Sequence, residues 1–126
     1  MSNLLHPPYP TDPSDEQEDL PLHWQYLHDL SGDNPEFELE LLSIFVEDTQ
    51  LHLDALKHAI VTQDFVTIAQ ETHHVKGASA NIGAVPMQAA ALKLEQQAKL
   101  DQLEGADQLC QELQNFLDRI RAYVQR

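Results

Sequence analysis

Residues 71–83 read ETHHVKGASANIG, and the spacing of their side chains predicts a helix with one buried face. Each residue of an α-helix turns about 100° from the last, so positions four and three apart share a face. We expect this face to form the core seam: Ile68, Thr72, Val75, Ser79 and Ile82. Gly83 follows the seam and can end the helix in a left-handed conformation, which glycine adopts easily.

The flanking segments also predict helices. Asn34 followed by Pro35 is a typical helix start, because asparagine caps the free N–H groups and proline fits the first turn. The long helix that follows has these buried candidates: Leu41, Phe45, Leu51, Leu56 and Ile60. Asp64 is placed to cap the helix that carries residues 71–83, and Pro86 is placed to open the next, which runs through MQAAALKLEQQAKL.

A short helix and a final long helix complete the expected elements. The short one has apolar residues at Leu22, Tyr26, Leu27 and Leu30, and SGDNP ends it. The last one carries this stripe: Leu109, Leu113, Phe116, Leu117, Ile120 and Val124. No alternating strand pattern stands out. The chain is therefore predicted to be all-α, an antiparallel four-helix bundle with a short additional N-terminal helix.

The 126-residue chain divides by composition into a tail and one domain. Residues 1–19 contain four prolines and five acidic residues but little apolar surface, so we expect a disordered acidic, proline-rich tail. Residues 20–126 are long enough for a single domain with one core.

The charge restricts the partners. Asp and Glu number 21 against 7 Lys and Arg, a net charge of -14. Such a chain should repel nucleic-acid phosphates and anionic membrane surfaces. It shows no apolar run of the roughly 20 residues that span a membrane and no secretory signal. With one cysteine, Cys110, which is expected to be a core residue, a reduced cytoplasmic protein is predicted.

Two adjacent histidines occupy different positions on the predicted helix. The helical neighbours of His73 are three small residues and one cation: Ala69, Gly77, Ala80 and Lys76. Because three of these neighbours are small, His73 is accessible to a large partner. His74 lies farther round the helix without a lysine one turn on, which suits an ordinary solvated histidine.

The chemistry open to His73 is nucleophilic. A neutral, exposed imidazole can take up a phosphoryl group at one ring nitrogen, while the other nitrogen donates a hydrogen bond that fixes the tautomer. Lys76, at i+3, is on the right side to offset the phosphoryl charge.

The motif HHVKGASANIGA, residues 73–84, resembles that of the histidine phosphotransfer (HPt) domain family, whose pattern is H-x-x-K-G followed by a small residue, a short polar-apolar stretch and glycine. The resemblance extends over residues 20–126, including the LSGDNPEF entry to the long helix and LKLEQQAK. It implies that His73, not His74, is phosphorylated and that Lys76 stabilises the phosphate. It also implies that Glu95 occupies the position of a polar side chain that hydrogen-bonds the histidine ring from the next helix.

The resemblance implies a phosphorelay intermediate. His73 accepts a phosphoryl group from a receiver-domain aspartate and passes it to another receiver, with a hybrid histidine kinase as a further possible partner. The receiver supplies Mg²⁺, and the chain itself has no cofactor. A monomer is favoured. No ATP-binding fingerprint is present, so we expect no kinase activity.

Two alternatives remain open from the sequence. The chain could be a non-phosphorylated helical-bundle binding protein that regulates a signalling partner. Gly77 could serve receiver docking, with Ala69 and Ala80, or a close helix–helix contact inside the bundle. A metal site is not expected, because there is no H-E-x-x-H or cysteine cluster, and because His52 and His58 lie about 240° apart around one helix.

Overall fold

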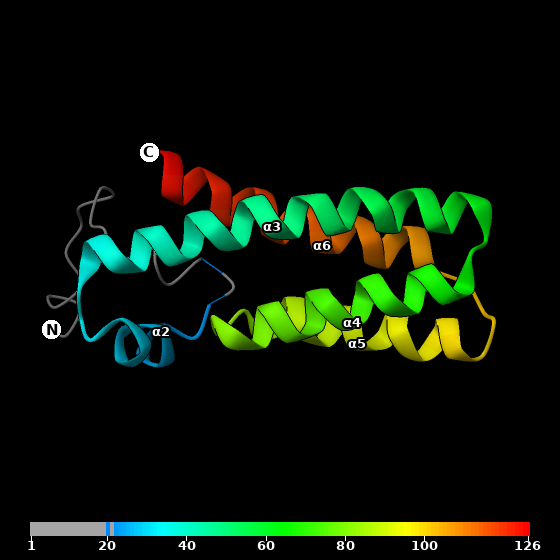
Figure 1. Cartoon of the computed structure of the whole chain (residues 1–126), viewed down its shortest axis with the longest axis horizontal. Coiled ribbons are helices and arrows are strands. Elements are labelled where there is room, and N and C mark those ends of the chain that lie inside the picture. Colours follow the sequence, from blue (N-terminus) through cyan, green and yellow to red (C-terminus); the bar gives the residue numbers. More distant parts are fainter. Residues whose placement is uncertain (1–19, 21) are drawn as a thin grey trace, which may run out of the picture.

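The computed structural model describes residue 20 and residues 22–126 (Figure 1). This part of the chain forms helices and no strands: α2 (Trp24–Ser31), α3 (Pro35–Thr62), α4 (Phe65–Asn81), α5 (Val85–Lys99) and α6 (Ala106–Gln125). The tail expected at residues 1–19 lies outside the described residues. Within them, no helix is both long and apolar enough to cross a membrane.

The four long helices form the predicted antiparallel bundle. α4 packs against both α3 and α5, and α6 packs against the same two helices. α2 contacts α3 near one end of the bundle (Figure 1). The fold class is therefore confirmed, including the short additional helix before the bundle.

Helix boundaries follow the predicted caps. Asn34 Oδ1 accepts a hydrogen bond from the Phe37 N–H at 3.1 Å, at the start of α3. Asp64 Oδ1 accepts one from the Thr67 N–H at 3.1 Å, at the start of α4. Gly83 has φ +78°, and a Cβ there would lie 3.2 Å from His23 atoms, so both its backbone conformation and its surroundings favour glycine.

The core seam of α4 is buried as predicted: Ile68, Thr72, Val75, Ser79 and Ile82. Cys110 is also buried, and burial raises the pKa of its thiol. The expectation for Leu51 is wrong, because its side chain is 70% exposed. Leu53 fills the core instead. Two helical steps turn about 200°, so Leu51 lies on the opposite side of α3 from Leu53.

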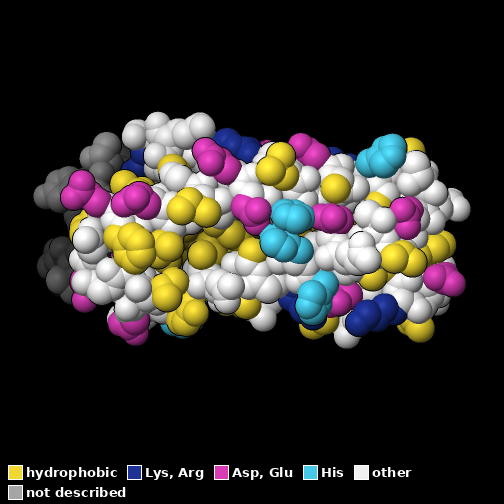
Figure 2. Space-filling model, in the orientation of Figure 1, with side chains coloured by type: hydrophobic (Ala, Val, Ile, Leu, Met, Phe, Trp, Pro, Cys, Tyr) yellow, Lys and Arg dark blue, Asp and Glu magenta, His cyan; other side chains and the backbone are white. Residues whose placement is uncertain are grey.

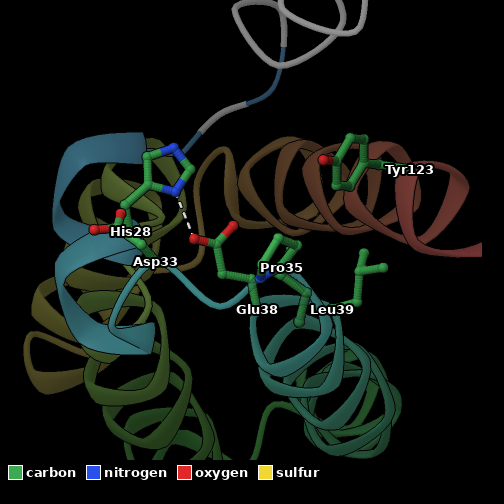
Figure 3. A pocket seen from close by; sticks show the side chains of 7 residues that line it. His28, Asp33, Pro35, Glu38, Leu39 and Tyr123 are labelled. Carbon is green, nitrogen blue, oxygen red and sulfur yellow. Dashed lines mark hydrogen bonds and ion pairs between the residues drawn. The ribbon is translucent and has the colours of Figure 1, made fainter.

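Polar contacts attach α2 to α3. The carboxylate of Glu38 is largely buried, and its Oε2 lies 2.5 Å from His28 Nδ1 and 2.9 Å from Ser31 Oγ. Figure 3 shows His28 pointing toward Glu38, with Tyr123 of α6 lining the same pocket. The buried carboxylate thereby has hydrogen-bonding partners on α2, which fixes that helix on the bundle.

Candidate functional site: an exposed histidine held by a buried glutamate

His73 projects from the middle of α4 with its side chain 71% exposed. Its Nδ1 lies 3.0 Å from Oε2 of Glu95, which comes from α5. The side chain of Glu95 is only 6% exposed. A buried group on one helix thus holds an exposed ring on its neighbour, which restricts how the ring can turn.

Glu95 is ionised in this setting. Burial raises its pKa, but hydrogen bonds from Lys76 and His73, together with the positive charges of Lys76 and Lys99, outweigh burial and lower the pKa below its usual value. An ionised carboxylate accepts hydrogen bonds and cannot donate one. His73 Nδ1 therefore carries the proton in the contact with Glu95.

The fixed proton determines which nitrogen of His73 can react. In a neutral imidazole one nitrogen bears hydrogen and the other has a free lone pair. With hydrogen on Nδ1, the lone pair is on Nε2. The arrangement thus presents an exposed imidazole with a single nucleophilic nitrogen.

Two lysines share the Glu95 carboxylate. Lys76 Nζ lies 2.7 Å from Oε1, and Lys99 Nζ lies 3.6 Å from Oε2. The structure places Glu95 in contact with both His73 and Lys76, and the contact with His73 is the one that the family resemblance implied. Lys99 was not anticipated, although its i+4 spacing from Glu95 on α5 could have indicated it.

The surface beside His73 is open. A Cβ added at Gly77 would meet nothing within 4 Å, and Gly77 itself is exposed. Ala69 and Ala80 are partly buried. Among the described residues no other helix approaches Gly77 closely, so a close helix–helix contact within this part of the chain does not explain this glycine.

His74 is exposed, as expected from the sequence, but it also has partners on α3. Its Nε2 lies 2.8 Å from Asp48 Oδ2 on α3, and its ring stacks on that of His52 with 3.6 Å between centroids. Sequence spacing does not reveal these partners, because it relates His74 only to residues on its own helix. α3 packs against this side of α4 and supplies both partners.

Comparisons with known proteins identify the family of this chain. Residues 40–123 match the model of the Hpt domain family. The chain is 29% identical over 94 residues to the phosphorelay intermediate protein rdeA of Dictyostelium discoideum; the match covers 75% of this chain and 37% of that protein's length.

Two solved structures share the fold. Histidine-containing phosphotransfer protein B of Pseudomonas aeruginosa has a TM-score of 0.76 and 26% identity, over 82% of this chain and 90% of that one. The HPT domain of a sensor hybrid histidine kinase from Shewanella has a TM-score of 0.68 and 20% identity, over 83% and 91% of the two chains, which shows the fold alone. With the family match over most of the bundle, the chain belongs to the Hpt domain family.

Proposed function

We propose that this chain is a phosphorelay intermediate that accepts a phosphoryl group on His73 Nε2 from a receiver-domain aspartate and passes it to a second receiver aspartate. The observation that carries the proposal is the contact of His73 Nδ1 with the ionised, buried Glu95 at 3.0 Å, on a ring that is otherwise exposed. Family membership supports a phosphotransfer intermediate and does not favour the alternative of a non-phosphorylated binding protein.

The transfer step needs little from this chain beyond its nucleophile. The lone pair of His73 Nε2 attacks phosphorus, the bond from phosphorus to the receiver carboxylate breaks, and the aspartate leaves as a carboxylate. The imidazole gains positive charge as the P–N bond forms. The ionised Glu95 next to Nδ1 stabilises that charge without itself reacting.

Lys76 has two tasks in this proposal. Its ammonium group holds Glu95 ionised through the 2.7 Å contact with Oε1. The same flexible side chain, 27% exposed, can exchange this contact for a phosphoryl oxygen when one arrives. Lys99 then remains near Glu95 and keeps the carboxylate compensated.

The docking surface is proposed to be the open patch around His73 formed by Ala69, Gly77 and Ala80. A receiver must bring its aspartate within bonding distance of Nε2, and small residues on one helix face allow that approach.

The receiver supplies Mg²⁺, which offsets phosphoryl charge, and a hybrid histidine kinase is a further proposed partner. We propose that the chain acts as a monomer in the cytoplasm, where Cys110 stays reduced, without cofactor or ATP-dependent kinase activity of its own.

The test is transfer from a receiver labelled on its phosphoaspartate. Label should move to this chain, and it should be lost in acid but persist in base, as expected of a phosphoramidate. Incubation with ATP and Mg²⁺ alone should leave the chain unlabelled. An acid-stable product, or no transfer from any receiver that phosphorylates other Hpt domains, would contradict the proposal.

A further inference from the structure

A second cluster of chemically active side chains lies where α4 meets α3. Asp48 and His52 occupy successive turns of α3, and Glu71 and His74 occupy successive turns of α4. In the space-filling view, histidine side chains lie against one another midway along these helices, with acidic side chains on either side (Figure 2).

The geometry points to a zinc-class metal site formed by Asp48, His52 and His74. One ligand atom from each of these residues lies within 4.8 Å of the others. Both Nε2 atoms face the Asp48 carboxylate: His74 Nε2 lies 2.8 Å from Oδ2, and His52 Nε2 lies 3.6 Å from Oδ1. In a tetrahedral site with bonds of about 2.0–2.1 Å, two ligand atoms lie roughly 3.3 Å apart. Each distance lies within about half an ångström of that spacing, but the two run to different oxygens, so Asp48 must turn to present one oxygen to both rings.

Glu71 prepares His52 as a ligand. Its Oε1 lies 2.5 Å from His52 Nδ1, on the far side of the ring from Asp48. A carboxylate that accepts the Nδ1 hydrogen leaves the lone pair on Nε2, which is the arrangement found around histidines that bind metals. Glu71 is thus a positioning residue rather than a ligand.

A cation would also relieve an electrostatic conflict. With its hydrogen donated to Glu71, a neutral His52 turns its Nε2 lone pair toward the negative carboxylate of Asp48. A metal ion between them converts this repulsion into two bonds. The competing explanation is a proton on His52 Nε2, which would make the cluster a simple ion-pair network and give it no special affinity for zinc.

The ligand types select the class of metal. Imidazole nitrogen with one carboxylate suits zinc, copper or nickel, whereas magnesium and calcium prefer oxygen ligands. The rings stack with 23° between their planes, so both must tilt toward the ion to aim their lone pairs. Their side chains are 28% and 44% exposed, which leaves room for that tilt and for water as a fourth ligand.

Calorimetric titration of the chelator-treated full chain with Zn²⁺ tests the site. We expect one zinc per chain and no comparable binding of Mg²⁺. His74→Gln and Asp48→Asn should each weaken zinc binding at least tenfold, and Glu71→Gln should weaken it by about tenfold or more because it releases the ring of His52.

Two matched controls separate the cluster from other histidines. His58→Gln removes an exposed histidine of α3 outside the cluster and should leave the zinc Kd unchanged. His73→Gln should also leave the zinc Kd unchanged, which would exclude His73 as a zinc ligand. Circular dichroism checks that each variant is folded.

Nuclear magnetic resonance of the wild-type chain gives a readout that needs no variant. Zinc should shift the ring protons of His52 and His74 and leave those of His58 unaffected. The proposal is overturned if zinc shifts all exposed histidines alike, if the cluster variants bind as tightly as wild type, or if Mg²⁺ competes equally. These measurements use unphosphorylated protein without a receiver, so their failure would leave the proposed relay function untouched.

Discussion

His73 and His74 are neighbours in the chain but belong to different sites. His73 faces α5 and rests on the single carboxylate of Glu95, which two lysines compensate. His74 faces α3 and meets a second histidine and Asp48. One residue of α-helix turns a side chain by about 100°, which is enough to exchange one partner helix for another. The function of a helical histidine therefore depends on which neighbouring helix its face meets.

The largest contrast should be in phosphoryl acceptance. His73→Gln should abolish labelling by a phosphorylated receiver, because the amide offers no nucleophilic nitrogen, while the fold survives at an exposed position. His74→Gln should retain most of the acceptance. Single-turnover transfer with labelled receiver measures both. Equal loss in the two variants would show that the two sites are not independent.

Gly77→Gln should have the second-largest effect on phosphoryl transfer. The added side chain enters open space, so the melting temperature should stay equal or rise slightly, since glycine costs about 0.5–1 kcal/mol in a helix relative to alanine. Transfer should fall on the order of a hundredfold, because displacement of reacting groups by about 1 Å is that costly. Thermal melts and transfer rates on the same variant check this. A destabilised variant whose folded fraction transfers normally would refute a docking role.

Glu95→Ala should slow transfer by roughly ten- to a hundredfold, the equivalent of a charge-assisted hydrogen bond of about 1.5–3 kcal/mol. The ring of His73 then loses the contact that fixes its tautomer. Glu95→Gln keeps a hydrogen-bond acceptor but loses the negative charge that stabilises the imidazolium, so it should restore the rate only in part. Rapid-quench kinetics of the two variants separate the contribution of the hydrogen bond at position 95 from the contribution of the negative charge. Identical rates in both would indicate that only the charge matters.

Lys76→Ala should have a smaller effect, about tenfold or less. The lysine forms no bond to phosphorus, is partly exposed, and divides its charge between Glu95 and the phosphoryl group. Lys99 Nζ remains 3.6 Å from Glu95 Oε2 and offsets part of the carboxylate charge that Lys76 no longer balances. Transfer rates of Lys76→Ala and of the double variant with Lys99→Ala measure this. If neither variant slows transfer, the proposed role of Lys76 is wrong.

The smallest expected effect is on acid stability. The pKa of Glu95 is lower in the folded chain than its ordinary value of 4.5, so its contribution to folding is fully present above that pH. It is lost as pH falls through the lower, folded-state pKa. Urea midpoints of wild type and Glu95→Gln should therefore differ at pH 7, and the difference should shrink as the pH falls below about 4.5. The matched control is exposed Glu112→Gln, and a gap that widens in acid would contradict the sign.

The local rules of helix formation were sufficient for most of the fold. Caps at Asn34 and Asp64, the turn at Gly83 and the seam of α4 all depend on residues close in sequence, and all are confirmed. The error at Leu51 arose because an apolar residue was assigned to the core without checking its angular position. In the structure Leu53 occupies the buried side of α3.

Part of the site around His73 could also be predicted from helical spacing. His73, Lys76 and Gly77 lie within one and a half turns of helix, so their shared face follows from spacing alone. Glu95 was located only through the resemblance to a family, because it comes from another helix. The ionisation of Glu95, and with it the reactive nitrogen of His73, required the buried contact to be known.

Sequence spacing was enough to identify the helices, their ends, the core seam and the motif around His73, because these depend on interactions within a few residues. What each histidine contacts depends instead on how the helices pack. Along the sequence, His52 and His58 share one helix but not one face of it. The bundle instead pairs His52 with His74 from another helix, with 3.6 Å between their ring centroids. Contacts between helices depend on how the helices pack against one another, and that packing brings together residues which no local spacing relates.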